Sequence, residues 1–289
     1  MLLTADRKGN ITKESSFQDR FLDKIYSHTI GRMMIRIMIL PVVSKGCGFL
    51  LDSKISKCLI PSFIRNNSIS MEEYEKKDYC SFNDFFTRKI LVEARPIEQF
   101  PESFISPCDS RLSVYPISKK STFEIKHTKY TAYSLLRNRK LAEKFAGGYI
   151  FIFRLCVDDY HRYIYIDDGK VSDSVKVSGV FHTVNPVAND NFPIYKENTR
   201  EYSLLRSKNF KTVLQMEVGA LLVGKIENNP VNGKVSRGQE KGYFAYGGST
   251  VILMTQKGAV CPDKDILRNT VRGIETKVKM GEQVGKKNI

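Results

Sequence analysis

Two patterns of apolar residues divide the chain near residue 95. Before that point apolar side chains recur at helical spacing, as at Phe17, Phe21 and Ile25, and a second apolar run covers residues 30–40. Such spacing places the apolar side chains on one face of a helix. The pattern therefore predicts a mostly helical region over residues 1–95.

The helical region is also basic. Residues 1–70 contain 11 Lys and Arg against 5 Asp and Glu. Ser70 followed by Glu73 has the spacing of a capping box and predicts another helix start. Basic amphipathic helices pack on a protein core or lie on a membrane surface, and both interpretations remain open at this point.

After residue 96 the pattern changes to short runs rich in β-branched and aromatic residues. Pairs that contain glycine, at 147–148, 168–169 and 232–233, separate these runs. We predict an antiparallel, β-rich domain over residues 96–289. The fold class is then α+β, with the helical N-terminal region packed on a β-sandwich or barrel. The predicted strands cover residues 149–155, 163–166, 216–226, 243–246 and 251–254.

A weak internal repeat lies near the C-terminus. The segment KVSRGQEKG at 234–242 recurs 43 residues later as KVKMGEQVG at 277–285. Each copy has a glycine at its centre and another at its end. The repeat predicts two similar strand–turn units and a quasi-symmetric β-domain.

Composition and charge narrow the function classes. The chain is 42% hydrophobic and 27% charged, which is typical of a globular protein and excludes a disordered one. Its net charge of +15 favours an anionic partner, either nucleic acid or an acidic membrane. The Lys and Arg residues are spread along the whole chain and match no nucleic-acid-binding module, so we expect no nucleic-acid partner.

The sequence contains no segment typical of membrane insertion or secretion. No apolar run reaches the 18 residues of a membrane-spanning helix, and charges occupy the first 15 residues, where a signal peptide would be apolar. We therefore expect the protein to stay in the cytosol. The six cysteines form no CxxC pair, so neither a zinc site nor a disulfide framework is expected, and we predict no metal.

The segment with the most specific chemistry reads GYFAYGGSTVIL over residues 242–253, where Gly247 and Gly248 precede Ser249 between two predicted strands. A glycine pair at such a place indicates a bulge or a sharp turn. It also suits a strained turn in which the Ser249 hydroxyl attacks the Gly248 carbonyl carbon. The second interpretation predicts a chain that cleaves its own backbone.

This segment is one of eight that occur in a characteristic order. The other seven are FNDFFTRK (82–89), ARPI (94–97), SPCDSRL (106–112), DDYHRY (158–163), HTVNPVA (182–188), REYSLL (200–205) and VGALLVGKI (218–226). Together they resemble the phosphatidylserine decarboxylase proenzymes of the pyruvoyl-dependent, prokaryotic type. The resemblance runs through nearly the whole chain.

The resemblance implies a reaction and a cofactor. The chain would cleave itself between Gly248 and Ser249 into a β chain of residues 1–248 and an α chain of residues 249–289. Ser249 would become a covalent pyruvoyl group. This group is an electron sink that allows phosphatidylserine to lose CO2 and become phosphatidylethanolamine, as a step of phospholipid biosynthesis.

The resemblance also implies site residues. The family uses an Asp-His-Ser set for self-cleavage, and Asp109 matches its aspartate, although Ser110 follows where the family most often has glycine. Family members commonly read YHRxH. His161 matches the first histidine, which the family uses in decarboxylation, whereas Ile164 replaces the second histidine, which is usually assigned to self-cleavage.

Ile164 leaves the base for Ser249 open, because isoleucine cannot carry a proton. Three alternatives remain. His182 supplies the base from a neighbouring strand, a bulge at residues 162–163 turns His161 inward, or the chain does not mature. The last alternative corresponds to a second candidate function, an unprocessed phospholipid-binding homologue without decarboxylase activity.

The resemblance implies that the anionic partner of this positively charged chain is a membrane surface. Residues 1–70 contribute +6 and residues 249–289 contribute +4 to the net charge of +15. Basic residues near an anionic leaflet each add about 1 kcal/mol of attraction. We therefore expect a peripheral protein on the cytoplasmic side of the cell membrane, with phosphatidylserine, the anionic membrane surface and its own two chains as partners. The sequence leaves a homodimer open.

Overall fold

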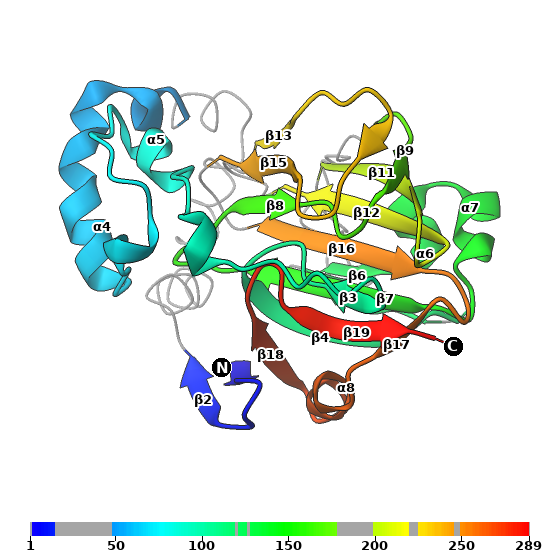
Figure 1. The fold of residues 1–289 in the computed structure, drawn as a ribbon. Helices are drawn as coiled ribbons and strands as arrows, with labels where there is room; N and C mark the ends of the chain where they lie inside the picture. Colours follow the sequence, from blue (N-terminus) through cyan, green and yellow to red (C-terminus); the bar gives the residue numbers. More distant parts are fainter. Residues whose placement is uncertain are drawn as a thin grey trace, which may run out of the picture.

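One large sheet, flanked by smaller sheets and short helices, forms the protein in the computed structural model (Figure 1). Several predicted features lie outside the described residues, namely the apolar positions between residues 17 and 40, His182 and Gly248. The structure describes residues 2–14, 48–118, 121–125, 128–177, 199–219, 225–245 and 249–288.

The large sheet has the strand order β14-β9-β11-β12-β16-β7-β4-β18-β1-β2, and β10 also pairs with β11. Its pairs are antiparallel except for β1 with β18. The strands are β1 (Leu2–Ala5), β2 (Ile11–Glu14), β4 (Ser110–Pro116), β7 (Tyr149–Leu155), β9 (Gly169–Val171), β10 (Val175–Val177), β11 (Arg200–Ser207), β12 (Thr212–Val218), β14 (Lys234–Val235), β16 (Ser249–Thr255) and β18 (Ile274–Val278).

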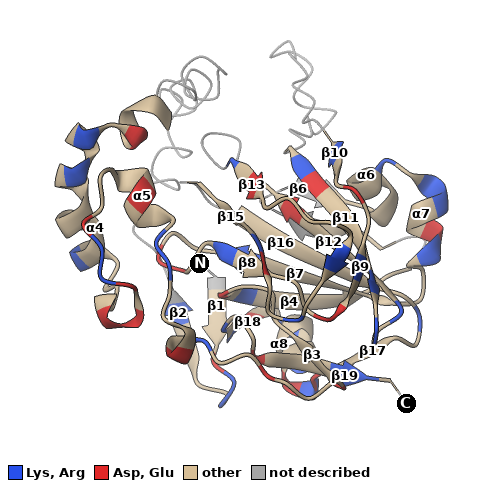
Figure 2. Ribbon diagram, turned by 45° about the horizontal axis from the view of Figure 1, so that its top comes forward, with Lys and Arg blue, Asp and Glu red and all other residues tan. Residues whose placement is uncertain are grey.

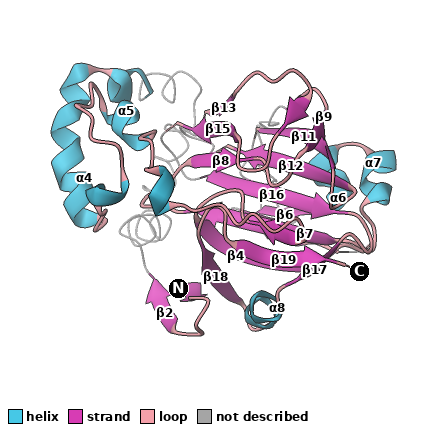
Figure 3. Ribbon diagram, viewed as in Figure 1, coloured by secondary structure: helices cyan, strands magenta, loops and turns pink. Residues whose placement is uncertain are grey.

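Smaller elements surround this sheet (Figure 3). The small sheets are β13 (Ile226–Asn228) with β15 (Glu240–Phe244) and β8 (Arg162–Ile164), β17 (Val260–Pro262) with β19 (Gln283–Lys287) and β3 (Ser103–Ile105), and β5 (Phe123–Ile125) with β6 (Thr128–Tyr130). The helices are α4 (Ile60–Asn66), α5 (Phe82–Phe86), α6 (Ala132–Leu136), α7 (Arg139–Lys144) and α8 (Lys264–Val271), with 3-10 turns at Lys54–Leu59, Met71–Glu73 and Val92–Ala94.

Both faces of the large sheet are covered, and each has its own apolar core. Alternate residues of a strand point to opposite faces, so Val213 of β12 joins one core with Phe153 and Val251, whereas Leu214 joins the other with Ile252. The first core lies under the small sheets of β8, β13 and β15 and of β3, β17 and β19, and the second lies under α6, α7 and the β5–β6 pair. The predicted α+β class with an antiparallel sandwich is confirmed.

Two predictions for the N-terminal region are wrong. Residues 2–14 were predicted to be helical but form the β1–β2 hairpin, which extends the large sheet beside β18. Ser70 precedes only a single 3-10 turn, Met71–Glu73, and its side chain makes no capping hydrogen bond. Helices do occur in the rest of the described region before residue 95. Within the described part of the chain, no helix is long and apolar enough to cross a membrane.

The internal repeat corresponds to two similar units, as predicted. In each copy a strand ends, a glycine with positive φ makes the turn, and a second strand follows. These glycines are Gly238 (φ +80°) and Gly281 (φ +82°). Both turns pack against Ile97 of the ARPI segment, since a Cβ atom built on either glycine would lie within 3.2 Å of an Ile97 side-chain carbon.

Gly281→Ala is expected to destabilise the protein by about 2–4 kcal/mol, because strain at positive φ adds to overpacking against Ile97 and the Pro96 carbonyl. Gly233→Ala is the matched control. Gly233 also has positive φ (+72°), but a Cβ atom built on it would have no other atom within 4 Å, so only the strain of about 1–2 kcal/mol applies. Urea unfolding measures both free energies. Equal losses would show that the contact with Ile97 does not matter.

Candidate functional site

Ser249 is the first residue of β16 and lies directly opposite Leu155 of β7. The residue is 1% exposed, and its Oγ makes no hydrogen bond to any residue that the structure describes. Burying a hydroxyl without a partner costs free energy, but Ser110 and Ser203 are also buried in this way, so burial alone assigns no role. Ser249 differs from them because it directly follows the Gly247–Gly248 pair in the sequence, where a free hydroxyl can act as a nucleophile on the preceding peptide bond.

Asp109 lies at the same end of the sheet as Ser249. The residue after it, Ser110, begins β4, and β4 and β16 pair with opposite sides of β7. Two strand spacings therefore separate the starts of β4 and β16, which is about 10 Å. The structure thus brings Asp109 and Ser249 into one region but not into hydrogen-bond contact.

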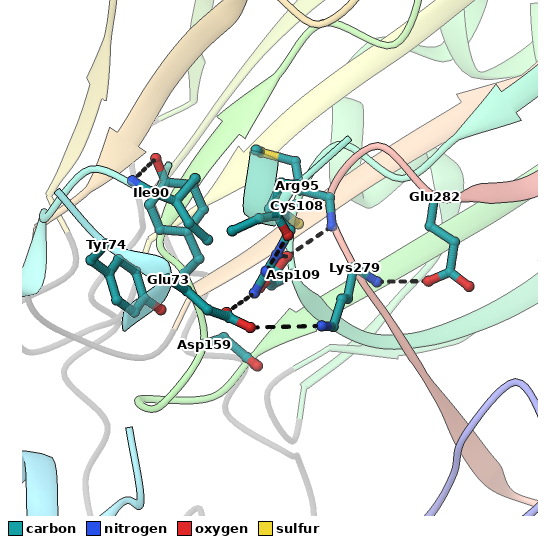
Figure 4. Close-up of polar contacts among 12 residues, drawn as sticks. Glu73, Tyr74, Ile90, Arg95, Cys108, Asp109, Asp159, Lys279 and Glu282 are labelled. Carbon is teal, nitrogen blue, oxygen red and sulfur yellow. Dashed lines mark hydrogen bonds and ion pairs between the residues drawn. The ribbon is translucent and has the colours of Figure 1, made fainter. Parts of the chain in front are cut away.

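The Asp109 carboxylate is held from two sides (Figure 4). Arg95 donates from Nε to both carboxylate oxygens at 2.9 and 3.0 Å and from Nη2 to Oδ2 at 2.6 Å. The backbone N–H of Met280 donates to Oδ1 at 2.8 Å. Arg95 also forms an ion pair with Glu73 at 3.0 Å. Burial lowers the pKa of Arg95, but the hydrogen bonds and charges of Asp109 and Glu73 outweigh that effect and raise the pKa above its ordinary value.

His161 is fully buried in the loop between β7 and β8. Its Nδ1 lies 2.9 Å from the carbonyl oxygen of Asp159, and its ring centre lies 4.2 Å from that of Phe86. A carbonyl only accepts, so Nδ1 carries the proton of the neutral ring and Nε2 is the basic nitrogen. The His161 carbonyl accepts from the N–H of Phe244 of β15, which anchors this loop to the small sheet of β8, β13 and β15.

Asp159 organises the loop that carries His161. Its Oδ2 accepts from the N–H of Cys156 at 2.7 Å and forms an ion pair with Arg111. Arg111 also reaches the carboxylate of Asp158 at 3.3 Å. Burial raises the pKa of Asp159 from 3.8 to about 6, against the opposing effect of the Arg111 guanidinium.

This pKa predicts how stability depends on pH. The folded state binds the Asp159 proton more tightly than the unfolded state does. The resulting contribution of Asp159 to the free energy of unfolding is therefore complete below about pH 4, and it is lost as the pH rises past about 6. Relative to Asp159→Asn, the wild type should lose on the order of 2–3 kcal/mol over this range. Urea titrations at several pH values measure the difference. Asp158→Asn removes a neighbouring carboxylate that also raises the Asp159 pKa, so it should reduce this pH dependence but not abolish it, because burial is the larger cause.

Ile164 is a core residue of β8. It is buried among apolar side chains, and its N–H donates to the carbonyl of Pro107 at 2.9 Å, beside the segment that carries Asp109. The register between β8 and β15 is irregular at Lys241, between Glu240 and Gly242. The extra residue is therefore in β15, and the bulge considered at residues 162–163 of β8 is not observed.

Lys241 and Glu217 form a buried ion pair that the sequence did not predict. Lys241 is 2% exposed and Glu217 is fully buried, and Nζ donates to both carboxylate oxygens at 2.6 and 2.7 Å. Burial raises the pKa of Glu217, and Lys241 opposes that rise. Glu217 lies directly opposite Val251, so the pair is close to the start of β16.

Sequence reasoning also missed Arg95 and Asp159, although both lie inside quoted segments, ARPI and DDYHRY. The available signals were a charged residue next to proline, for Arg95, and a charged residue within a strand-like run, for Asp159.

Among the described residues, Cys156, Asp158 and Asp159 could together approach a metal ion. Arg154 donates to Cys156 Sγ at 3.1 Å and Arg111 binds the two carboxylates, so this group is neutralised by guanidinium groups. Burial raises the pKa of Cys156 to about 12, which keeps the thiol protonated.

Comparisons with known proteins place the chain among carboxy-lyases, and the relatives reported below are named proenzymes. A family model described as phosphatidylserine decarboxylase matches residues 82–286. The chain therefore belongs to the phosphatidylserine decarboxylase family, as its eight segments predicted.

Individual relatives cover nearly the full length. The chain is 44% identical to phosphatidylserine decarboxylase proenzyme 2 of Clostridium acetobutylicum, over 95% of this chain and 94% of the relative. It is 43% identical to the proenzyme of Clostridium novyi, over 93% of each. It is also 44% identical to that of Clostridium tetani, over 82% of this chain and 81% of the relative.

Proposed function

We propose that the chain is a proenzyme that cleaves itself between Gly248 and Ser249, and that the pyruvoyl group derived from Ser249 decarboxylates phosphatidylserine to phosphatidylethanolamine. Family membership supports the reaction. The observation that carries the proposal is the Ser249 hydroxyl, which is buried at the head of a strand with no hydrogen bond to a described residue.

Self-cleavage needs only groups of the chain and water. Ser249 Oγ adds to the Gly248 carbonyl carbon and its proton passes to a base. The C–N bond between the two residues then breaks, the nitrogen takes a proton, and an ester joins Gly248 to Ser249 Oγ. β-Elimination leaves a carboxylate on Gly248 and dehydroalanine at 249. Addition of water and loss of ammonia complete the pyruvoyl group.

The surroundings of Ser249 suit a group of this kind. The pyruvoyl group is close in size to serine, so it fits the buried position at the head of β16. When formed, it supplies an electron sink for the electron pair that stays on the substrate when CO2 leaves. Ser249 lies opposite Leu155 in a sheet whose core is apolar, and this surrounding restricts water.

His161 is the proposed proton donor of the decarboxylation step. Its Nδ1 is oriented by the Asp159 carbonyl, and this contact fixes the basic nitrogen at Nε2. Asp109 is the proposed aspartate of the self-cleavage set, and Arg95 and Met280 hold its carboxylate in place. The base that takes the Ser249 proton is His161 or His182, and His182 lies outside the described residues.

We also propose that the protein binds the cytoplasmic face of an anionic membrane through its N-terminal helical part. Phe49, Leu50 and Ile55 are 78%, 65% and 83% exposed. Lys54 and Lys57 lie in the same segment of the sequence. Figure 2 shows Lys and Arg along the helical part around α4, at the left. Exposed apolar side chains with adjacent cations are typical of a surface that enters the lipid interface.

Phe49→Ser with Ile55→Ser is expected to reduce binding to phosphatidylserine vesicles roughly tenfold or more, because each apolar side chain in the interface contributes about 1–2 kcal/mol. Val271→Ser is the control, since Val271 is 88% exposed on α8. Vesicle flotation at two salt concentrations measures both. Equal binding of the double variant and the control would contradict this membrane contact.

The mass of the purified protein tests the main proposal. Processing yields two chains, residues 1–248 and 249–289, with a blocked N-terminus on the smaller one, and the preparation releases CO2 from phosphatidylserine. A single intact chain of 33.0 kDa with an ordinary serine at 249 would instead identify an unprocessed homologue.

A further inference from the structure

A cavity lies far from Ser249, at the opposite end of the large sheet. Its volume is about 580 Å³, within the range of small-molecule sites, and Gln256 and Thr212 lie on its wall. Gln256 is seven residues beyond Ser249 along β16 and the turn after it, so about 23 Å of extended chain separates them. The cavity lies between α7 and the edge of the sheet at β9 and β11, away from α4 and α5 (Figure 1).

Cations surround this cavity in an unusual arrangement. Lys170 of β9 lies directly opposite Arg206 of β11 on one side and Lys234 of β14 on the other. Directly opposite residues of neighbouring strands project from the same face of a sheet, so three like charges form a row. Lys144 of α7 also lines the cavity and adds a fourth cation.

Like charges directly opposite on neighbouring strands repel each other, so this row is expected to destabilise the fold. All four side chains are exposed, and none forms an ion pair with a carboxylate in the part of the chain that the structure describes. None of the residues that line the cavity is acidic. The nearby Glu143 is paired with Arg139 instead. The repulsion would be relieved by an anion bound among the four.

The remaining walls are apolar. Leu141 and Phe145 from the helical side and Leu204 from β11 line the cavity below the cations. A phosphate group suits the rim, since Arg206 can donate two parallel hydrogen bonds to it and the lysines add charge. An apolar chain attached to that phosphate suits the walls.

We propose that this cavity binds one anionic phospholipid, with its phosphate among Lys144, Lys170 and Arg206 and the start of its acyl chains against Leu141, Phe145 and Leu204. This lipid site is separate from the site at Ser249, and it does not depend on the proposed decarboxylation. A lipid bound there stabilises the fold by removing the repulsion within the cationic row.

Calorimetric titration with dihexanoyl phosphatidylglycerol, an anionic lipid that has no serine to decarboxylate, tests the site in the full chain. We expect one equivalent to bind, and binding to weaken at least tenfold in Arg206→Gln and in Lys170→Glu. Lys264→Glu on α8 is the control for Lys170→Glu, since it makes the same charge change at an exposed position, and it should bind as the wild type does.

Thermal unfolding gives an independent readout. Without lipid, Lys170→Glu should melt at a higher temperature than the wild type, because the new carboxylate faces Arg206 and Lys234. With lipid, only the wild type and Lys264→Glu should gain stability. The proposal is overturned if the pocket variants bind as well as the control, or if dihexanoyl phosphatidylcholine binds as tightly. Inorganic phosphate binding as tightly as the lipid would overturn the lipid assignment.

Discussion

Ser249→Ala is expected to leave the protein as one uncleaved chain of 33.0 kDa that releases no CO2 from phosphatidylserine. Alanine has no hydroxyl to attack the Gly248 carbonyl, so neither the ester nor the pyruvoyl group can form. The fold should survive, because the lost Oγ makes no hydrogen bond to a described residue. Intact mass spectrometry and a CO2-release assay measure the two losses.

Ser203→Ala is the matched control for this change. Ser203 is also buried in the large sheet, on β11, and its Oγ likewise makes no hydrogen bond to a described residue. Its loss should leave both cleavage and CO2 release at wild-type levels. If Ser249→Ala still produced a fragment that begins at residue 249, the proposed nucleophile would be wrong.

Lys241→Met should destabilise the protein by about 3–5 kcal/mol. The substitution leaves the fully buried Glu217 without its cation, and an uncompensated buried charge is among the most costly defects in a core. The nearby Asn228 side chain also donates to Glu217, but this hydrogen bond is long, at 3.4 Å, and carries no charge, so it cannot replace an ammonium group. Urea unfolding in the Ser249→Ala background measures the change on a single, uncleaved chain.

A double variant separates the lost ion pair from lost packing. Glu217→Leu combined with Lys241→Met replaces both charges by apolar side chains, so it should recover most of the stability that Lys241→Met loses. The recovery depends on the new side chains filling the space between the two sheets. A double variant no more stable than Lys241→Met would show that the shape of the lysine, rather than its charge, is required.

The strands could be predicted where apolar layers cover both faces of the sheet. The run predicted at 149–155 coincides with β7, Tyr149–Leu155, and the run at 251–254 lies inside β16, Ser249–Thr255. Burial on both faces makes such strands continuously apolar, and the signal is strong. The β1–β2 hairpin has four-residue strands and was missed, because its pairing with β18 depends on a contact distant in sequence.

In the candidate site, the sequence predicted which residues take part but not how they contact one another. Ser249, Asp109 and His161 were found because each lies in a recognisable segment. Their mutual geometry was not predictable, since Asp109 is engaged by Arg95 and Met280 while His161 is oriented by Asp159. Met280 lies 171 residues from Asp109 and Arg95 lies 14 residues from it, so no local spacing reports the contacts of Asp109. Asp159 lies only two residues before His161, but the loop conformation decides that its carbonyl faces the ring.

By itself, the sequence determined the family, the α+β class and the serine on which the proposed chemistry depends, because these are recorded in local segments and in the alternation of apolar residues. Only the tertiary structure decided which charges meet. It paired Lys241 with Glu217 inside the core, and it aligned Lys170 with Arg206 and Lys234 at one edge of the large sheet. Strand order and register set these distances, and the energy of a charge depends on its distance to other charges and on its burial.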